Sequence, residues 1–386
     1  MKVLAVTGIR SEYDILYPVI DELRKNGADV TIAVSGAHLS DQQGNTYQRI
    51  KEDGFEIADC IDTLFSTDRL VQRPKAVAQL VLGLTQTVDR LDPDFLLVIG
   101  DREESIATAI VGNYMDKLVV HIGGGDPVYG NADDPVRFAV SKLAHVHCCT
   151  AKPYAENLLK VGEEDFRVFW TGNPAYVNIS QTEQLDLQGL SDYLDVDISN
   201  GRYIVLIKHP LSSEMSEAKQ QMEITLSALD VFCRKHDYKT IIIPPNTDPG
   251  SNDLRNVISQ YESSDFLHSV KTLPRVQFVN LIRNTRALAG NSSMGILEAP
   301  FYKLPVVNIG HRQQGRLNAG NVEFVAHDKE DIVTSLEKAC FDEEYRIHIS
   351  NLINPYGDET AAIKIRKVIE SIDLLDKRWY TKEKLC

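Results

Sequence analysis

The feature that most constrains the fold is a repeated alternation of short apolar runs with helical stretches. The apolar runs have the length of buried strands, and in the first half they are Val3–Thr7, Asp29–Val34, Phe95–Ile99, Leu118–Ile122, Val146–Cys149 and Val168–Thr171. Amphipathic patterns between them predict helices at Tyr13–Lys25, Arg73–Arg90, Glu103–Tyr114, Pro135–Leu143 and Tyr154–Val161. Continuous apolar strands that alternate with helices indicate a parallel sheet covered on both faces.

The alternation restarts after a polar stretch near Ser180–Gly201, which we interpret as a linker. The later strands are predicted at Tyr203–Ile207, Thr240–Ile243, Ala287–Ala289 and Val306–Ile309. The later helices are predicted at Glu214–His236, Asp253–Glu262, Val276–Arg283, Asp331–Cys340 and Glu359–Leu375. A chain of 386 residues is also too long for one ordinary core. We therefore predict an α/β fold of two doubly wound domains facing a cleft, with the boundary near residue 180 and the ligand in that cleft.

The composition argues against several classes of function. The formal charge of −14 argues against a nucleic-acid or anionic-membrane surface. No apolar run approaches the roughly 20 residues that span a bilayer, and the start Met1–Gly8 reads as a first buried strand rather than a signal peptide. The six cysteines have no metal-ligand spacing. We expect a cytoplasmic protein with reduced thiols that uses no metal and no cofactor, and that binds neither membrane nor nucleic acid.

The stretch Gly290–Pro300 (GNSSMGILEAP) follows a predicted strand and opens a predicted helix. Ser292 and Ser293 therefore lie where unpaired N–H groups and the positive end of a helix dipole favour an anion, most often phosphate. Glu298 is too deep in the helix to cap it and is suited to accept hydrogen bonds from ribose hydroxyls. These residues favour a nucleoside diphosphate. The alternative is an ordinary serine-capped helix.

Other candidates also follow strands. Arg10 lies after the first strand, where it is either a diphosphate ligand or a surface arginine. Asp101 is either a cleft carboxylate for acid–base chemistry or a helix cap. Pro210 keeps His209 out of a helix, so that His209 is either a cleft residue or an ordinary core or surface histidine. Arg312 and Arg316 add positive charge near the serine pair in sequence.

An acidic, glycine-rich loop follows the strand that ends at His121. It contains Gly123–Gly125, Asp126 and the pair Asp133 and Asp134 at a helix start, of which one is expected to cap the helix and the other to be free for chemistry. Its acidity argues against a second phosphate site and suits the hydroxyls and protons of a sugar. Its glycines do not form a dinucleotide-binding fingerprint.

Seven motifs occur in the order found in a known family: Thr7–Tyr13, Gly100–Arg102, the glycine loop after His121, Gly172–Pro174, Asn246–Gly250, Gly290–Pro300 and Asn308–Arg316. Over residues 1–325 the chain resembles the hydrolysing UDP-N-acetylglucosamine 2-epimerases of sialic-acid and legionaminic-acid biosynthesis. The resemblance implies the glycosyltransferase-B architecture, with Rossmann-like domains at 1–180 and 181–358 and the C-terminal segment 359–386 packed back on the first. It also implies a homodimer or homotetramer.

The resemblance implies a UDP-sugar substrate and a two-stage reaction. Anti elimination of UDP gives a 2-acetamidoglucal, and water then adds to yield free N-acetylmannosamine. Asp101, Asp133 and His209 match the family's acid–base positions, and Glu298 matches its ribose-binding glutamate. The residues that would contact the diphosphate are then Arg10, Ser292, Ser293, Arg312 and Arg316. Asn246, in the polar turn Pro244–Ser251 that follows a predicted strand, is a further substrate-binding candidate.

One position departs from the family. Gly123 stands where some relatives have a catalytic acidic residue, while Asp126 lies three residues later and one extra residue precedes Asp133. Either Asp126 supplies the missing carboxylate, or the substrate differs, for example a 2,4-diacetamido-6-deoxy sugar or a GDP-linked one.

Three alternatives remain. A glycosyltransferase of the same architecture needs an acceptor site, often with a basic membrane-facing helix, and the sequence has no such stretch. A nucleotide-sugar-binding regulator without chemistry would not need Asp101, Asp126 and Asp133 in the first half. A non-hydrolysing epimerase would return a nucleotide-linked sugar.

Overall fold

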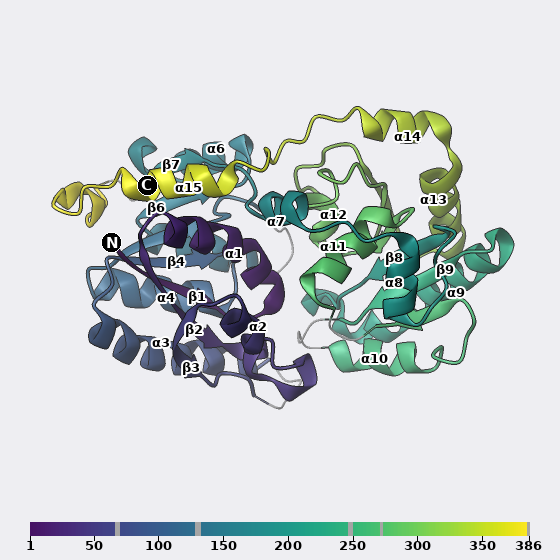
Figure 1. The fold of residues 1–386 in the computed structure, drawn as a ribbon, viewed down its shortest axis with the longest axis horizontal. Helices are drawn as coiled ribbons and strands as arrows, with labels where there is room; N and C mark the ends of the chain where they lie inside the picture. The colour runs from purple at the N-terminus through teal and green to yellow at the C-terminus, as the bar shows by residue number, and fades with distance from the viewer. Residues whose placement is uncertain (66–69, 128–132, 246–249, 271–272, 384–386) are drawn as a thin grey trace. The chain divides into compact units, whose positions relative to one another are not determined.

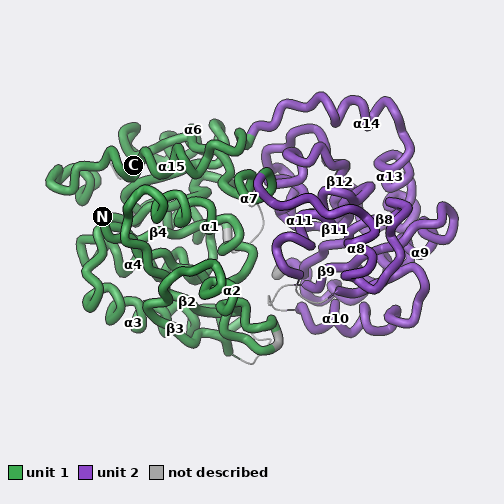
Figure 2. The backbone as a smooth tube through the Cα atoms, viewed as in Figure 1, with its two compact units in different colours: residues 1–127, 132–180, 356–386 green, residues 128–131, 181–355 purple. Residues whose placement is uncertain are grey.

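The computed structural model describes residues 1–65, 70–127, 133–245, 250–270 and 273–383 and divides them into two compact units (Figures 1 and 2). Unit 1 contains the described residues of 1–127, 133–180 and 356–383, and unit 2 contains those of 181–355. Each unit is a parallel sheet flanked by helices, so the predicted α/β doubly wound class is confirmed. Within the described ranges, no helix combines the length and apolar character needed to cross a bilayer.

Unit 1 is built on a seven-stranded parallel sheet in the order β3-β2-β1-β4-β5-β6-β7. Its strands are β1 (Lys2–Thr7), β2 (Asp29–Ser35), β3 (Glu56–Ile61), β4 (Phe95–Ile99), β5 (Leu118–Ile122), β6 (Val146–Cys149) and β7 (Val168–Trp170). Every residue of β4, β5 and β6 is buried, because helices cover both faces of the sheet.

The helices of unit 1 are α1 (Arg10–Lys25), α2 (Tyr47–Glu52), α3 (Gln72–Leu91), α4 (Glu103–Tyr114), α5 (Asp133–Leu143), α6 (Lys152–Lys160), α7 (Ala175–Gln181) and α15 (Ala361–Glu370). Helix α15, near the C-terminus, packs beside α1 (Figure 1). Its Ile365 and Ile369 are buried in the same apolar cluster as Leu16 and Ile20 of α1. Helices α3 and α4 cover the opposite face of the sheet, where they pack in an apolar cluster that includes Leu4 and Leu96.

Unit 2 has a six-stranded parallel sheet in the order β10-β9-β8-β11-β12-β13. Its strands are β8 (Tyr203–Ile207), β9 (Lys239–Ile243), β10 (Leu267–Ser269), β11 (Leu288–Gly290), β12 (Val306–Ile309) and β13 (Val322–Val325). Its helices are α8 (Leu187–Leu194), α9 (Ala218–His236), α10 (Ser251–Ser259), α11 (Arg275–Asn284), α12 (Met294–Leu297), α13 (Lys329–Phe341) and α14 (Glu343–Ser350). The main core joins β8, β9 and β12 to α9, α10 and α13.

Three strands were missed by the sequence analysis, and all three are at sheet edges: β3, β10 and β13. An edge strand is covered less fully than a central one, and most residues of β3 and β13 are only partly buried or exposed. Their sequences therefore lack the continuous apolar run by which the central strands were recognised.

The stretch near Ser180–Gly201, which we interpreted as a linker, belongs to unit 2 from Gln181 onward. It contains α8, whose first turn is capped by Asp186 accepting a hydrogen bond from the Gly189 N–H at 2.7 Å. Leu190 and Leu194 are buried, and α8 packs against α11. Polar residues on the outer face of this short helix hid its apolar spacing.

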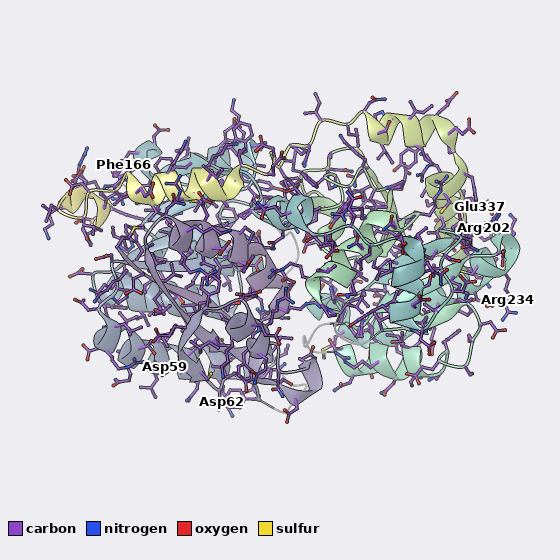
Figure 3. The ribbon with its side chains drawn as sticks, in the orientation of Figure 1. Asp59, Asp62, Phe166, Arg202, Arg234 and Glu337 are labelled. Carbon is purple, nitrogen blue, oxygen red and sulfur yellow. The ribbon has the colours of Figure 1, made fainter. Side chains whose placement is uncertain are left out.

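Several charged side chains at the surface of unit 2 pair with one another; Figure 3 labels Arg202 and Glu337, each of which is a member of such a pair. Glu337 of α13 accepts hydrogen bonds from Lys235 and His236 at the end of α9, at 2.7 and 2.8 Å. Arg202 pairs with Asp237 at 3.4 Å, and both side chains are more than half exposed. Solvent-exposed pairs contribute at most about 1 kcal/mol each. A cluster of charge therefore does not by itself mark a site in this protein.

Candidate functional site

The strand order identifies one point in each sheet where a ligand is most readily bound. In unit 1 the chain reverses its direction of winding between β1 and β4, and in unit 2 it does so between β8 and β11. In open α/β sheets, ligands bind beyond the carboxyl ends of the two strands at such a switch point. The segments that follow these four strands carry Arg10, Asp101, His209 and Ser292, all of them predicted site residues.

Arg137 of α5 organises the acidic residues at the switch point of unit 1. Its guanidinium donates a hydrogen bond to the carboxylate of Asp101 and another, at 2.8 Å, to the carbonyl oxygen of Gly123. The same group lies 3.6 Å from the Asp126 carboxylate. The side chain of Asp101 is 17% exposed, whereas that of Asp126 is 2% exposed. Asp101 is therefore the one of the two that a bound molecule reaches without rearrangement.

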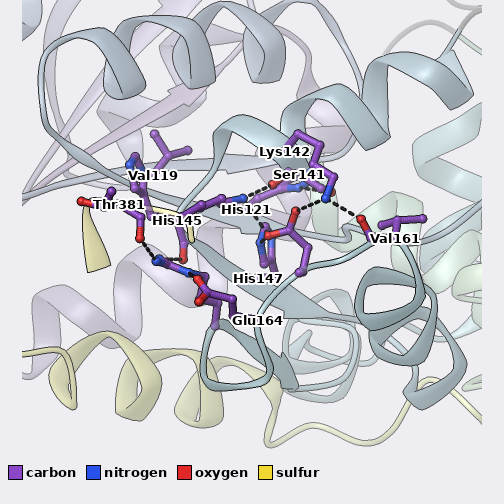
Figure 4. Close-up of polar contacts among 12 residues, drawn as sticks. Val119, His121, Ser141, Lys142, His145, His147, Val161, Glu164 and Thr381 are labelled. Atoms are coloured by element: carbon purple, nitrogen blue, oxygen red, sulfur yellow. Dashed lines mark hydrogen bonds and ion pairs between the residues drawn. The ribbon is translucent and has the colours of Figure 1, made fainter. Parts of the chain in front are cut away.

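His121 supports the backbone next to Asp101. Its Nε2 atom lies 2.7 Å from the Gly100 carbonyl oxygen, and its Nδ1 atom lies 3.3 Å from the Ser141 hydroxyl (Figure 4). Burial lowers the pKa of His121 to about 3, so that the ring is neutral at physiological pH. A neutral ring with both nitrogens engaged is a structural support rather than a proton donor to a ligand.

The three glycines after His121 serve packing. A Cβ atom added at Gly125 would lie 2.2 Å from the Tyr154 carbonyl oxygen, and one added at Gly124 would lie 3.0 Å from His121 and Ser141. Gly123 has a φ of +80°, a conformation that a side chain disfavours. The close contacts at this loop are therefore made by the protein's own backbone and side chains.

A second acidic group lies where β1, β2 and β4 end. Glu104 of α4 is 5% exposed, and its Oε1 atom accepts a hydrogen bond from the Ser35 hydroxyl at 2.9 Å. A Cβ atom at Gly8 would overlap this carboxyl group, at 1.8 Å, which explains the glycine in the first motif. Burial raises the pKa of Glu104 and of Glu12, and for Glu12 the charge of Glu104 raises it further. Arg102, within 4.0 Å of both, offsets part of this effect.

Arg10 is the first residue of α1, directly beyond β1. Its side chain is 23% exposed and its Nε atom lies 3.8 Å from the Asp14 carboxylate. The Arg10 guanidinium is thus partly exposed just beyond the carboxyl end of β1. Asp133 is the first residue of α5, and its side chain lies outside the described part of the structure.

The polar network behind the unit 1 site extends to the C-terminal segment (Figure 4). The Lys382 ammonium donates to the Ser141 carbonyl oxygen at 2.8 Å and to the Glu163 carboxylate at 2.7 Å. Arg167, which is fully buried, donates to the carbonyl oxygens of His145 and Trp379 at 3.3 and 2.8 Å. The C-terminal segment is thereby fixed to the helix that carries Arg137.

In unit 2, the backbone geometry of Gly290 brings the loop after β11 against the end of β8. Gly290 has a φ of +119°, and a Cβ atom there would lie 2.0 Å from the Ile207 carbonyl oxygen. The next residue, Asn291, accepts a hydrogen bond from the His209 N–H at 2.7 Å and donates one to the His209 carbonyl oxygen at 2.8 Å. This reciprocal pair fixes the backbone of His209 beside the serine pair.

The helix expected after the serine pair is only four residues long. This corrects the expectation that the positive end of a helix dipole favours an anion there. Helix α12 spans Met294–Leu297, and Glu298 is the residue directly after it. So short a helix has little dipole. The backbone N–H groups of Ser292 and Ser293 have no acceptor among the described residues, so they still offer two adjacent donors to an anion.

The loop after β12 is attached to the loop after β11. Arg312 and Gln313 both donate to the Asn291 carbonyl oxygen, at 3.1 and 3.0 Å, and Arg316 donates to the Gln313 side chain at 2.7 Å. The structure thus brings His209, Ser292, Arg312 and Arg316 into one region of unit 2 through Asn291. Asn246 lies outside the described residues.

Each unit therefore offers a distinct kind of chemistry. Unit 1 presents a partly exposed carboxylate held by an arginine, which suits proton transfer. Unit 2 presents backbone N–H donors and guanidinium groups, which suit a phosphate. No group of three or more His, Cys, Asp or Glu side chains within the described residues could hold a metal ion.

Sequence reasoning missed the residues that orient these groups: Arg137, Asn291 and Gln313. Arg137 lies inside a predicted helix, where an arginine is usually a surface residue. Asn291 and Gln313 lie inside recognised motifs but have no charge to distinguish them. Their only signal was membership of those motifs.

The chain is similar to known proteins over most of its length. Residues 21–370 match the family model described as UDP-N-acetylglucosamine 2-epimerase. The chain is 31% identical to the UDP-N,N'-diacetylbacillosamine 2-epimerase (hydrolyzing) of Legionella pneumophila, over 97% of this chain and 96% of that protein. It is 29% identical to the GDP/UDP-N,N'-diacetylbacillosamine 2-epimerase (hydrolyzing) of Campylobacter jejuni, over 83% of each.

A solved structure has the same fold. The crystal structure of the UDP-GlcNAc 2-epimerase from Neisseria meningitidis bound to UDP-GlcNAc superposes with a TM-score of 0.80. The match covers 96% of this chain and 100% of that one at 22% sequence identity. The family model spans most of the chain, and the match to the Legionella relative covers nearly all of both proteins, so the chain belongs to the UDP-N-acetylglucosamine 2-epimerase family.

Proposed function

We propose that the protein is a hydrolysing 2-epimerase that converts a UDP-linked 2-acetamido sugar into UDP and the free C2-epimeric sugar. The single observation that supports it most is the partly exposed Asp101 carboxylate, held by Arg137 at the switch point of unit 1. A protein that only binds a nucleotide sugar needs no such carboxylate. The names of the Legionella and Campylobacter relatives support the hydrolysing reaction.

In the proposed reaction, unit 2 binds the UDP moiety. The N–H groups of Ser292 and Ser293, with Arg312 and Arg316, stabilise negative charge on the diphosphate as it leaves. Glu298 accepts hydrogen bonds from the ribose hydroxyls. Arg10 of unit 1 contributes a further positive charge to the diphosphate.

Residues of unit 1, together with His209 of unit 2, carry out proton transfer on the sugar. A base removes the C2 proton, the C1–oxygen bond to the diphosphate breaks, and UDP leaves with the electron pair, which gives the 2-acetamidoglucal. Water then adds its oxygen to C1 while a proton returns to the opposite face of C2. We assign the acid–base positions to Asp101, Asp133 and His209. Asp126, which is almost fully buried, acts through Arg137 by helping to fix its guanidinium.

The substrate is proposed to be a UDP-linked 2-acetamido sugar, either UDP-N-acetylglucosamine or its 2,4-diacetamido-6-deoxy analogue. The relatives named for the diacetylated sugar favour the second. The product is then the free manno-configured sugar, which is N-acetylmannosamine in the first case.

The experiment is a comparison of three substrates in deuterium oxide, followed by NMR: UDP-N-acetylglucosamine, its 2,4-diacetamido-6-deoxy analogue and a GDP-linked form of that analogue. The expected result is release of UDP together with a free manno-configured sugar that carries deuterium at C2. Nucleotide release without deuterium at C2 would contradict the proposal. An epimeric product that is still nucleotide-linked would identify a non-hydrolysing enzyme, and turnover only with an added acceptor would identify a glycosyltransferase.

A further inference from the structure

Lys208 is a buried amine at the switch point of unit 2. It directly follows β8 and is 2% exposed. Its Nζ atom lies 3.5 Å from Nδ1 of His327, and within the described residues no carboxylate lies within 4.0 Å of it. The charge of Glu214, in the 3₁₀ helix Ser212–Glu217, acts to raise the pKa of Lys208, and the Glu214 carboxylate accepts a hydrogen bond from Gln221 at 2.7 Å. A buried ammonium without an ion-pair partner is costly, so the position calls for an anion that the described residues do not supply.

The contact between Lys208 and His327 also shows where the Lys208 amine lies relative to the strands of unit 2. Lys208 follows β8 and His327 lies just after β13, and these strands are three positions apart in the sheet, about 14 Å at about 4.8 Å per strand. Side chains that meet from such distant strands must cross the carboxyl ends of β11 and β12. His327 lies directly on that path, because a Cβ atom at Gly310 would be 2.5 Å from its Nε2 atom.

The amine therefore lies below the two loops to which we assigned the diphosphate, those that begin at Gly290 and at Gly310. Its surroundings are basic. Burial lowers the pKa of Lys208 to about 7, and only the charge of Glu214 opposes this. Burial also lowers the pKa of His327 to about 4, with smaller contributions from the charges of Lys208 and His311. A neutral His327 can accept a hydrogen bond from a Lys208 ammonium, and so allows the amine to be charged once an anion arrives.

We propose that Lys208, supported by His327, is a diphosphate ligand of unit 2 and takes up a proton from solvent when a nucleoside diphosphate binds. This inference rests on the proposed function, because it assigns one more residue to the same nucleotide site. In the free protein near pH 8 the amine is largely neutral. The negative charge of the diphosphate then favours the ammonium, so binding of the nucleotide and of one proton are coupled.

The test is calorimetry of UDP binding to the full-length protein at pH 8, in HEPES and in Tris, which differ in ionisation enthalpy. UDP is fully ionised at this pH, so a difference in heat between the buffers reports protons bound by the protein. We expect an uptake of roughly 0.5–0.9 proton per UDP. The UDP affinity is expected to fall as pH rises above 7, by no more than about tenfold per pH unit for one coupled proton.

Two variants separate charge from structure. Lys208→Met is expected to weaken UDP binding by about 10- to 100-fold and to abolish proton uptake. Lys208→Arg is expected to retain affinity within a few-fold without uptake, because a guanidinium stays charged throughout this pH range. Lys338→Met is the matched control, because Lys338 pairs with Glu323 away from these loops at 2.8 Å and should leave affinity and uptake unchanged. Thermal melts of each variant check that unit 2 is folded.

The outcomes are distinguishable. If the wild-type protein binds UDP without proton uptake, or if Lys208→Met leaves affinity and uptake unchanged, the inference is wrong and the proposed function stands. If the wild-type protein binds no UDP, both the proposed function and this inference are wrong.

Discussion

Arg137 binds the carboxylate of Asp101 while the same guanidinium donates to the Gly123 carbonyl oxygen at 2.8 Å. Two directional hydrogen bonds from one planar group fix where the Asp101 carboxylate points. The Gly123 backbone, with a φ of +80°, becomes an acceptor that anchors the arginine.

Replacing Arg137 by lysine is expected to lower kcat by about 10- to 100-fold, because an ammonium keeps the charge but cannot bond both groups in the geometry of a guanidinium. Steady-state kinetics measure this effect. Arg90→Lys, at an exposed ion pair with Asp59, is the control, and an equal loss of kcat in the two variants would contradict the assigned role.

Asp101→Asn is expected to lower turnover by about 10²- to 10⁴-fold, because an amide cannot exchange the proton that elimination requires. UDP affinity should stay near that of the wild type, since the diphosphate contacts are assigned mainly to unit 2. Calorimetry with UDP and NMR of C2 exchange measure the two quantities. Asp116→Asn is a suitable control, because Asp116 is exposed and its φ of +53° suits asparagine equally well. A variant that kept its rate and lost UDP affinity would show that the role is wrong.

Glu298→Ala tests the ribose assignment. We expect UDP affinity to fall by about 10- to 100-fold, the value of one or two hydrogen bonds to a charged acceptor, while pyrophosphate affinity changes little. Competition of UDP and pyrophosphate against the substrate measures both. Glu323→Ala, which removes a partner of Lys338, controls for loss of negative charge in unit 2. Equal losses for UDP and pyrophosphate would place Glu298 away from the ribose.

Lys208→Met should raise the stability of unit 2, because a buried ammonium costs free energy. The folded-state pKa of about 7 lies below the ordinary value of 10.5, so the unfolded chain binds this proton more tightly. The cost is therefore fully present below pH 7 and declines as pH rises from 7 toward 10.5. Urea unfolding should show a gain of about 1–3 kcal/mol at pH 6.5 and a smaller one at pH 9.5. A gain that grew with pH would contradict the assigned cause.

Arg167→Met is expected to destabilise unit 1 by about 2–4 kcal/mol. The buried guanidinium donates to the carbonyl oxygens of Trp379 and Thr381 at 2.8 and 2.7 Å, and its loss removes the donor to both acceptors. Limited proteolysis should then release the C-terminal segment earlier than in the wild type. Arg378→Met is the neighbouring control, because that side chain is largely exposed and pairs with Asp376. Matching losses in the two variants would show that the buried contacts contribute little.

Several strands could be predicted to the residue, among them Phe95–Ile99, Leu118–Ile122 and Tyr203–Ile207. Each is a continuous apolar run with helices on both sides, so local composition alone determines it. The edge strand Glu56–Ile61 could not be recognised, because its pairing with β2 rather than its own composition makes it a strand. The helix of the Gly290 motif was predicted too long, since α12 ends after one turn at Leu297.

The sequence by itself determined the fold class, the order of the elements and the loops that hold polar residues, because hydrophobic periodicity is a local property of the chain. Only the tertiary structure decided which of those residues meet. Arg137 reaches Asp101 across 36 residues and Lys208 reaches His327 across 119. Such contacts depend on the order of strands in each sheet, and that order arises from the packing of the whole domain rather than from any segment of it.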